Sequence, residues 1–424
     1  MQIAPAGDRA VLIELGEVTA EELHAMSNAA RAIPGVLRVT PGHSSLYVIC
    51  DRAPDLTALA NIPRQPATGN RQRITTHHIP VSFTGPDLEA FLSHVNITRE
   101  AFLARIPTIR LVARYLGFRA GFAYLDGWPE EWSMPRRPTS RPVAAGSFAI
   151  AGNVAGFYPI DTPGGWNVLG RTAADLSIAP GDEIQLSSRS AATPVAALVR
   201  PPTRAAAPAA ALLQAPLATW TGAPFDTIAA ALANEAVGNA PNAPILECPF
   251  AGPRIRFAHD ATIAWCTPDL GITVERVRIN DERHFGRITG GLRAYLAIGD
   301  GPPRPASGRR TGNRLRIHAR NGPHDLGLAN VECEVTPQLD RVGIRLRPLQ
   351  PLRVDVPADL KSIGMQCGTV QLHPDGSLVA MGPDHPVTGG YLQPMTVLSS
   401  ERWKLAQLVP GERITFVLDQ LPNA

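Results

Sequence analysis

The N-terminal part of the chain alternates short apolar runs with one amphipathic segment. The run RAVLIELG (Arg9–Gly16) is aliphatic, ends at glycine and predicts a strand. In TAEELHAMSNAARAI (Thr19–Ile33), apolar residues recur at helical spacing behind a Thr-x-x-Glu capping box, so we expect a helix. Gly35–Cys50 reads as two strands around a Pro-Gly turn, and a short helix follows. These elements indicate a small α+β domain over residues 1–72.

The next region begins with a strand and two helices and continues as short strands. A strand is expected over Ile74–Phe83, with helices over Gly85–Asn96 and Thr98–Ile106. From Tyr115 to Leu186, glycines and prolines separate short apolar runs such as GSFAIAG and DEIQLSS. Because closely spaced short strands are typical of barrels, we predict a β-barrel domain over residues 73–190.

An alanine- and proline-rich segment separates the two halves of the chain. Residues 191–211 show no hydrophobic periodicity, and their prolines favour extended backbone, so they predict a semi-rigid linker. Residues 212–424 again carry many short strands, with one clear helix over Phe225–Gly238. The polar stretch GPPRPASGRRTG divides this second β region into residues 212–300 and 313–424. The predicted fold is therefore mostly β.

Charge and cysteine usage narrow the classes of function. The chain has 424 residues and a net charge of only +3, which does not favour electrostatic binding of nucleic acid. Its five cysteines include no CxxC pair, so neither a disulfide framework nor a zinc site is expected. His77 and His78 would point to opposite faces of one strand, and we assign no metal. Without a signal-peptide pattern or a membrane-length apolar run, a cytoplasmic protein is expected.

An arginine pair closes a glycine- and aromatic-rich loop, GFRAGFAYLDGWPEEWSMPRR (Gly117–Arg137). Arg136 and Arg137, with Arg141 nearby, could hold a carboxylate, bicarbonate or phosphate, because guanidinium groups bind such oxyanions in bidentate fashion. A solvated surface turn would carry the same residues without binding anything. The sequence leaves both interpretations open.

Two Gly-Gly-aromatic blocks are candidate sites for an amide carbonyl, one in each half: TPGGWNVLGRT (Thr162–Thr172) and GPDHPVTGGYLQP (Gly382–Pro394). Adjacent glycines allow close approach of the backbone, and consecutive N–H groups can stabilise an oxyanion. A flat amide could also pack on the tryptophan. A β-turn beside a core aromatic is the alternative for each block. The residues predicted to line the site are Gly164, Gly165, Trp166, Thr388, Gly389 and Gly390.

Three further residues are candidates for the chemistry itself. Asp384 is the best carboxylate for moving a proton or orienting an amide N–H, although it could simply cap a hairpin turn. Tyr391 could donate a proton or form a wall, and Arg171 could hold an anionic group or be an ordinary strand arginine. In DRVGIRL, an internal pair of Asp340 with an arginine of the same segment is expected to serve stability.

The same blocks resemble a known pair of families. PAGDRAVLIELG, GFRAGFAYLDGWPEEWSMPRR and the segment from Arg141 to Thr172 resemble the KipI family, which comprises the B-type subunits of 5-oxoprolinase and is also called allophanate hydrolase subunit 1. ALANEAVGNAPNAPILE, GLRAYLAIGDG, DRVGIRL, GTVQLHPDG and the segment from Asp384 to Phe416 resemble KipA, the C-type subunit of 5-oxoprolinase, also called allophanate hydrolase subunit 2. The two subunits look fused, as in the carboxyltransferase domain of urea carboxylase.

The resemblance implies tandem cyclophilin-like β-barrel domains behind the α+β domain, and chemistry at an amide or ureido carbonyl. It also implies that Phe118, Phe122 and Tyr124 belong to a substrate-binding loop. The implied partners are a 5-oxoprolinase A-type subunit, with ATP, or a biotin carrier. The chain itself shows neither a nucleotide motif nor a biotinylation stretch.

Several family positions are changed. Alanine replaces proline at Ala120 and Ala144, Leu392 replaces the proline after GGY, and the family's TTVQDxGR block is absent. We therefore expect an enzyme acting on a small amide, lactam or ureido compound, by 5-oxoprolinase-like hydrolysis or ring opening or closing, in a cleft between the halves. Three alternatives stay open: a biotin-dependent carboxyltransferase component, a non-catalytic regulator of a histidine kinase, and an enzyme recruited to specialised metabolism.

Overall fold

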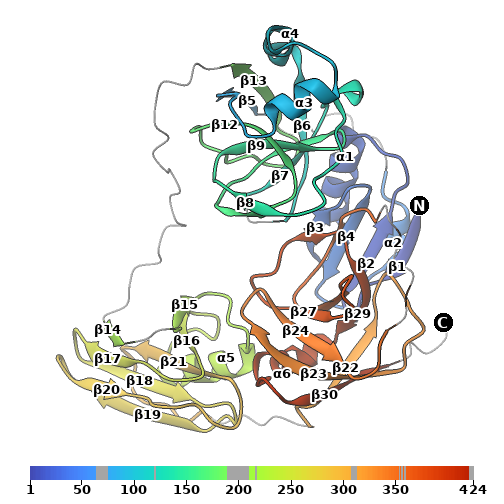
Figure 1. Ribbon diagram of the computed structural model, residues 1–424. Coiled ribbons are helices and arrows are strands. Elements are labelled where there is room, and N and C mark those ends of the chain that lie inside the picture. The colour runs from blue at the N-terminus through green and yellow to red at the C-terminus, as the bar shows by residue number, and fades with distance from the viewer. Residues whose placement is uncertain are drawn as a thin grey trace.

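The computed structural model describes residues 1–63, 75–118, 121–188, 210–214, 217–306 and 313–419, apart from 353, 355, 356, 358 and 359. It forms an α+β domain, a β-barrel, a two-sheet unit and a second barrel in chain order (Figure 1). Most of the predicted linker and Ala120 lie outside the described residues. The last two linker positions, 210 and 211, already belong to strand β14 (Ala210–Gln214).

The N-terminal domain is a four-stranded antiparallel sheet, in the order β1-β2-β4-β3, covered by helix α1. The predicted capping box is confirmed: the Thr19 side chain accepts from the N–H of Glu22, whose carboxylate accepts from the N–H of Thr19. The apolar face of α1 packs into the sheet's core. The elements are β1 (Gln2–Pro5), β2 (Ala10–Glu14), α1 (Ala20–Arg31), β3 (Val36–Pro41), β4 (Ser45–Cys50) and α2 (Leu56–Ala60).

The first barrel is a seven-stranded sheet in the order β12-β9-β10-β7-β6-β13-β5. Backbone hydrogen bonds of 2.8 and 2.9 Å between Ser82 and Arg171 join its two edges. Its elements are β5 (Thr76–Val81), α3 (Leu88–His94), α4 (Arg99–Arg105), β6 (Arg110–Leu116), β7 (Ala123–Asp126), β8 (Arg141–Val143), β9 (Ser147–Ala151), β10 (Val154–Phe157), β11 (Thr162–Gly164), β12 (Asn167–Arg171) and β13 (Glu183–Ser188).

The second half opens with a two-sheet unit whose helix α5 (Thr227–Ala236) confirms the predicted helix. Small alanine side chains let this helix pack closely on β18 and β21. The sheet orders are β14-β17-β20 and β15-β16-β21-β18-β19. Its other strands are β15 (Thr219–Thr221), β16 (Ile245–Pro249), β17 (Arg254–Phe257), β18 (Ala261–Cys266), β19 (Ile272–Val277), β20 (Glu282–His284) and β21 (Arg293–Gly299).

The C-terminal barrel is closed, in the order β22-β29-β26-β27-β24-β23-β30, around its own apolar core. The expected mostly-β fold with tandem barrels is thus confirmed. Its elements are β22 (Arg316–Asn321), β23 (Asn330–Leu339), β24 (Gly343–Pro348), β25 (Ile363–Gly364), β26 (Thr369–Leu372), β27 (Leu378–Met381), β28 (Thr388–Gly389), β29 (Leu392–Val397), α6 (Arg402–Ala406) and β30 (Arg413–Leu418).

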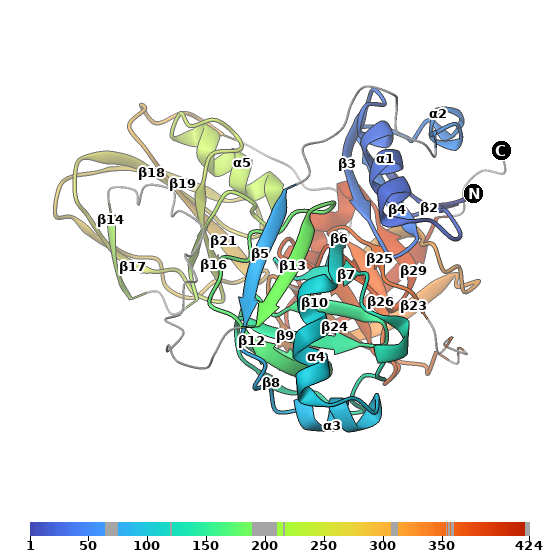
Figure 2. The ribbon, with the colours of Figure 1, turned by 90° about the horizontal axis from the view of Figure 1, so that it is seen from above.

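The N-terminal domain contacts both barrels (Figure 2). Arg114, on β6 of the first barrel, donates to the carbonyls of His43 and Val18 at 2.6 and 2.7 Å. From the C-terminal barrel, the Gln366 amide donates to the carbonyl of Ala6 at 3.1 Å. Segments distant in sequence therefore meet around the edge of the N-terminal sheet.

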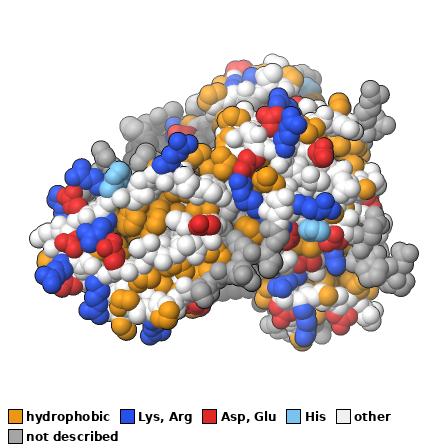
Figure 3. Space-filling view, turned by 90° about the horizontal axis from the view of Figure 1, so that it is seen from below, with side chains coloured by type: hydrophobic (Ala, Val, Ile, Leu, Met, Phe, Trp, Pro, Cys, Tyr) orange, Lys and Arg blue, Asp and Glu red, His pale blue; other side chains and the backbone are white. Residues whose placement is uncertain are grey.

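Basic and acidic side chains are interspersed over the face of the molecule shown in Figure 3. Among the described residues, Arg254 and Arg256 both bind Glu282 across neighbouring strands. Such exposed ion pairs contribute little to stability. They do prevent a large surface area from carrying charge of a single sign. No helix within the described ranges is both long and apolar enough to cross a membrane.

Candidate active site

The loop between β6 and β7 and the start of β12 build an aromatic cluster. Phe122 is buried at its centre, with ring centroids 5.5 Å from Phe118, 5.1 Å from Tyr124, 5.3 Å from Tyr158 and 5.3 Å from Trp166. All four pairs meet edge to face, which is favourable for aromatic rings. The rings of Phe118, Tyr124 and Trp166 are only partly buried, so a small flat molecule could contact them.

The first Gly-Gly block lies against this cluster and needs both glycines. A Cβ on Gly164 would overlap the Tyr158 phenol, and a Cβ on Gly165 would lie 3.1 Å from Nη2 of Arg136. The carbonyl of Gly165 accepts from the N–H of Arg137 at 2.8 Å. The glycines therefore allow the arginine segment to lie directly beside Trp166.

The two adjacent arginines have different surroundings. Arg137 donates to Asp87 at 2.9 Å, and Arg141 binds the same carboxylate. Asp87 is buried and also accepts from the N–H of Val168 at 2.7 Å. Arg136 is exposed and has no ion-pair partner within the described ranges. Arg137 and Arg141 thus hold the barrel together, whereas Arg136 is available for an anionic ligand.

The second Gly-Gly block contacts the aromatic loop from the other half of the chain. The Thr388 hydroxyl donates to the carbonyl of Leu116 at 3.3 Å. A Cβ on Gly117 would overlap that hydroxyl and lie 3.1 Å from the Tyr124 ring. Ser362 lies near the Tyr124 phenol and next to Gly390. We call this set the junction cluster, and its members are Tyr115, Phe118, Phe122, Tyr124, Arg136, Trp166, Ser362, Thr388 and Gly390.

Two stacked tyrosines provide hydrogen-bond donors in the junction cluster. The rings of Tyr115 and Tyr124 lie 4.4 Å apart at 16°, and Ser362 lies close enough to both phenols to lower the pKa of each. Burial raises the pKa of Tyr124 to about 12 and also raises the pKa of Tyr115. Both phenols are therefore protonated at neutral pH and can donate to a developing oxyanion, but neither can act as a base.

Sequence reasoning did not identify Tyr115, Ser362 or His43. The His43 N–H donates to the carbonyl of Ser362 at 2.9 Å, and its ring meets Tyr115 edge-on at 6.4 Å. Burial lowers the pKa of His43, with a smaller contribution from Arg114. None of the three belongs to a motif with recognisable spacing, so only their proximity in the fold connects them.

Asp384 lies in an ion-pair network with the two-sheet unit. Arg341 binds it in bidentate fashion, with two N–O distances of 2.8 and 2.9 Å, and also binds buried Glu247 at 2.9 Å. Although burial opposes the charged guanidinium, the two carboxylates raise the pKa of Arg341 above its usual value. Asp340 instead accepts from the N–H groups of Val342 and Gly343. The expected pair within DRVGIRL is therefore wrong, because the carboxylates that bind Arg341 come from other segments.

Three predicted site residues, Arg171, Tyr391 and Gly389, are not members of the junction cluster. Arg171, at the far end of β12 from Trp166, lines a pocket of about 310 Å³ and donates from Nε to the carbonyl of Ala145 at 2.9 Å. Tyr391 is exposed, and its ring stacks on His373 at 4.2 Å. Gly389 belongs to β28, where a Cβ would press on Met365 and Gln371.

Within the described ranges, no group of three or more His, Cys, Asp or Glu side chains could hold a metal ion. His77 makes a hydrogen bond of 2.8 Å with Asp182 and so joins β5 to the loop before β13. The polar groups of the junction cluster are hydroxyls, amides and guanidinium. Such groups suit a neutral or anionic organic ligand better than a cation.

Comparisons with known proteins match both halves of the chain. Residues 1–179 match the family "Carboxyltransferase domain, subdomain C and D", and residues 219–306 and 322–418 match "Carboxyltransferase domain, subdomain A and B". The first half is 30% identical over 190 residues to the B-type subunit of 5-oxoprolinase from Escherichia coli O157:H7, covering 42% of this chain and 87% of the relative. The second half is 26% identical over 264 residues to the C-type subunit of 5-oxoprolinase from Escherichia coli K12, covering 47% of this chain and 83% of the relative.

A solved structure has the same arrangement over nearly the whole chain. The crystal structure of TTHA0988 superposes with a TM-score of 0.78 at 24% identity, covering 97% of this chain and 100% of the other. At this identity the likeness concerns the fold. The order of both halves therefore also occurs in a single polypeptide of known structure.

Proposed function

We propose that this chain, which belongs to the carboxyltransferase-domain family, acts on a small amide, lactam or ureido compound at the junction cluster. Within that family it is a fusion of a KipI-like and a KipA-like part. The relatives are 5-oxoprolinase subunits and a putative urea carboxylase of Emericella nidulans, which is 26% identical over 267 residues and of which the chain covers 21%. An amide or ureido carbonyl is common to the compounds in those names.

The observation that carries this proposal is the position of Arg136. It lies beside Gly165 and the aromatic cluster without an ion-pair partner in the described part of the chain, while Arg137 next to it is bound to Asp87. Burial raises the pKa of Tyr124 and of Tyr158, and the positive charge of Arg136 acts on both phenols in the opposite direction. A substrate with a carboxylate and a flat carbonyl group would find a cation, aromatic faces and hydroxyl donors within one site.

The proposed chemistry is mostly electrostatic. Tyr124 and Ser362 donate to the carbonyl oxygen as it gains negative charge, and backbone N–H groups near Gly165 and Gly390 add to this stabilisation. Arg136 binds the anionic group of the substrate and so fixes the orientation of the carbonyl, which makes the reaction effectively unimolecular. Donors fixed before the reaction stabilise the transition state more than the substrate, which is what accelerates a step.

We assign the proton transfer to Asp384, and Tyr391 and Arg171 to supporting roles. In the free protein Asp384 is bound to Arg341, so it acts as a base only after that ion pair opens on binding substrate or a partner. This assignment implies that the ion pair between Asp384 and Arg341 breaks and forms again in each turnover. Its failure would leave the binding function of Arg136 intact, because different segments supply the two groups.

A carboxyltransferase component is the second candidate. The family description itself favours it, since both halves match carboxyltransferase subdomains. In that case a partner would supply a biotin carrier, and the junction cluster would bind the acceptor nitrogen compound. The 5-oxoprolinase-like candidate instead needs an A-type subunit with ATP.

A ligand panel followed by turnover assays tests the proposal. The purified chain is mixed with 5-oxoproline, urea and related lactams and ureides, and its thermal stability is measured, since a ligand of the folded state raises it. Compounds that bind are then assayed for turnover with an A-type subunit and ATP, and separately with a carboxylated biotin carrier. Arg136→Gln should abolish the thermal shift while Arg52→Gln, on a side chain that is 77% exposed, keeps it. No shift with any compound, or equal shifts in both variants, would contradict the proposal.

A further inference from the structure

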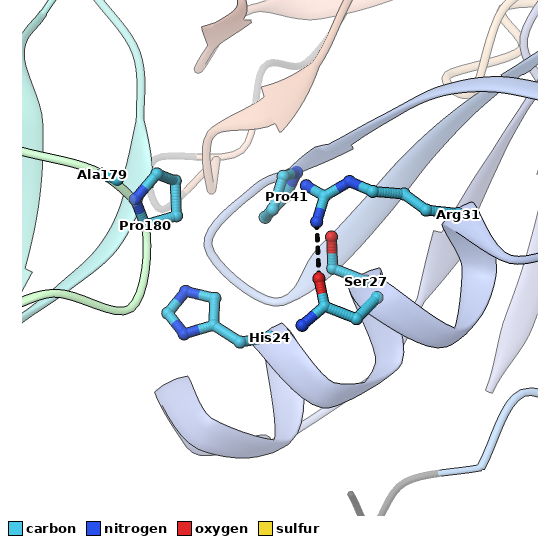
Figure 4. A pocket seen from close by; sticks show the side chains of 7 residues that line it. His24, Ser27, Arg31, Pro41, Ala179 and Pro180 are labelled. Atoms are coloured by element: carbon cyan, nitrogen blue, oxygen red, sulfur yellow. Dashed lines mark hydrogen bonds between the residues drawn. The ribbon is translucent and has the colours of Figure 1, made fainter. Parts of the chain in front are cut away.

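Helix α1 turns a polar face toward the first barrel instead of solvent. Leu23, Met26 and Ala30 pack into the N-terminal core. The positions next to them, at the i, i+3, i+4, i+7 spacing of a second helix face, are polar and line a pocket of about 110 Å³. Figure 4 shows this pocket between α1, Pro41 of β3 and the loop before β13. The lining residues are His24, Ser27, Asn28, Arg31, Pro41, Ala179 and Pro180.

One side of the pocket contains a hydroxyl that binds no other group in the described part of the chain. Ser27 is 1% exposed, and its Oγ has no hydrogen-bond partner among the residues that the structure describes. Leaving a buried donor unpaired costs free energy, so such groups normally face a water or a ligand. The pocket is far larger than the roughly 10–15 Å³ that one water needs. Ser27 is therefore positioned to donate to a molecule in the pocket.

Arg31 supplies the charge on the same side. Its Nη1 donates to Asn28 at 2.7 Å and its Nη2 to the carbonyl of Val39 at 3.4 Å, which leaves other N–H groups of the guanidinium unused. No carboxylate pairs with it among the residues that the structure describes. Burial lowers the pKa of Arg31, and a bound anion would offset that cost.

The other lining groups limit the ligand's charge and shape. The Nε2 of His24 contacts the carbonyl of Arg114 at 2.9 Å, and because a carbonyl can only accept, Nε2 carries the proton. Burial lowers the pKa of His24, so the ring is neutral and Arg31 is the one full positive charge among the described residues that line the pocket. Ala179 and Pro180 form an apolar wall across the pocket from Arg31 and Ser27, and Pro41 adds a further apolar group to the lining. One cation opposite an apolar wall matches a monoanion with a short apolar body.

We propose that this pocket binds a small monocarboxylate of the acetate or propionate class, separately from the junction cluster. The carboxylate accepts from Arg31 and Ser27, and the alkyl group contacts Pro41 and Pro180. Inorganic phosphate suits the pocket less well, because it needs donors on all sides and the wall offers none. Since α1 and the loop at Ala179 belong to different domains, the ligand would also join the N-terminal domain to the first barrel.

Calorimetric titration of the full chain with propionate and with inorganic phosphate, at constant ionic strength, tests this site. We expect propionate to bind with a dissociation constant on the order of 1 mM and phosphate to bind more weakly. Arg31→Gln should weaken propionate binding at least about tenfold, as expected for a charged hydrogen bond. Arg52→Gln removes the same charge from the same domain without touching the pocket, and should bind like the wild type.

Ser27→Ala tests whether the Ser27 hydroxyl binds the ligand or stabilises the folded protein. It removes a donor that is unpaired without ligand, so it should weaken propionate binding several-fold without lowering the free energy of unfolding measured in the absence of carboxylate. Arg136→Gln should leave propionate binding unchanged, which separates this site from the junction cluster. Equal affinities of the wild type and Arg31→Gln, loss of binding in Arg136→Gln, or tighter binding of phosphate than of propionate would each overturn the proposal.

Discussion

The hydroxyl of Thr388 lies 3.3 Å from the carbonyl oxygen of Leu116, although the two residues are 272 positions apart in the sequence. This contact joins the Gly-Gly-Tyr block of the second half to the glycine–aromatic loop of the first. Around it lie the stacked tyrosines and Ser362. The candidate site is therefore a property of the fused chain and not of either half.

The tight approach at this contact depends on a glycine. Gly117→Ala places a Cβ into the Thr388 hydroxyl, so we expect a loss of roughly 1–3 kcal/mol in the free energy of unfolding and loss of ligand binding at the junction cluster. Gly222→Ala is the matched control, because no atom of the described residues lies within 4 Å of a Cβ there. Urea denaturation measures both variants, and equal stabilities would show that Gly117 is not constrained.

The adjacent arginines should respond differently to the same change. Arg137→Gln weakens a hydrogen-bonded charge pair at Asp87, whose side chain is only 8% exposed, and should lower the free energy of unfolding by about 1.5–3 kcal/mol. Arg136→Gln should leave the unfolding curve unchanged and lower kcat/KM for the substrate. Thermal unfolding and steady-state kinetics of both variants are the measurements. A destabilised Arg136→Gln protein would refute the division of roles.

The network at Arg341 should be far more important for stability than its exposed end suggests. Arg341→Leu removes one of two arginines that bind Glu247, whose side chain is 2% exposed, and leaves Arg293 at 3.3 Å, so the loss should be about 1.5–3 kcal/mol, as for a hydrogen bond to a charged group. Asp384→Asn changes the half-exposed end, at 51%, and should cost less than about 1 kcal/mol. If both variants unfold at the same urea concentration, the network does not contribute as described.

Catalysis provides a separate test of Asp384. If it moves a proton, Asp384→Asn should lower kcat by about 10²–10⁴-fold while the thermal shift caused by the substrate persists. Tyr391→Phe, at an exposed residue with the supporting role proposed above, should lower kcat less than Asp384→Asn does. An unchanged kcat for Asp384→Asn would remove it from the mechanism and leave substrate binding at Arg136 unaffected.

The free energy of unfolding should fall at alkaline pH because of the buried Tyr124 phenol in the junction cluster. The folded protein holds the Tyr124 proton until its pKa of about 12, whereas the unfolded chain releases it near 10.0. Its contribution to stability is therefore complete below pH 10 and is lost as the pH rises toward 12, by up to about 3 kcal/mol. Tyr124→Phe should show a smaller fall in the free energy of unfolding over this range than wild type or Tyr391→Phe. Identical slopes would mean that Tyr124 is not shielded from solvent.

Local pattern was sufficient for the secondary elements. The Thr19–Glu22 capping box and the alanine-rich helix α5 follow from hydrogen bonds and packing between residues a few positions apart. The tandem barrels were expected from the resemblance of several sequence blocks to the KipI and KipA families. These predictions needed no knowledge of distant partners.

Only the tertiary structure decided which polar residues are free. Arg136 and Arg137 look equivalent in the sequence, and their difference arises because Asp87, 50 positions away, reaches one of them. Asp384 is bound by Arg341, and Ser27 faces a pocket instead of solvent because the first barrel packs against α1. Charge pairing and burial depend on which segments meet in space, and a linear sequence does not contain those distances.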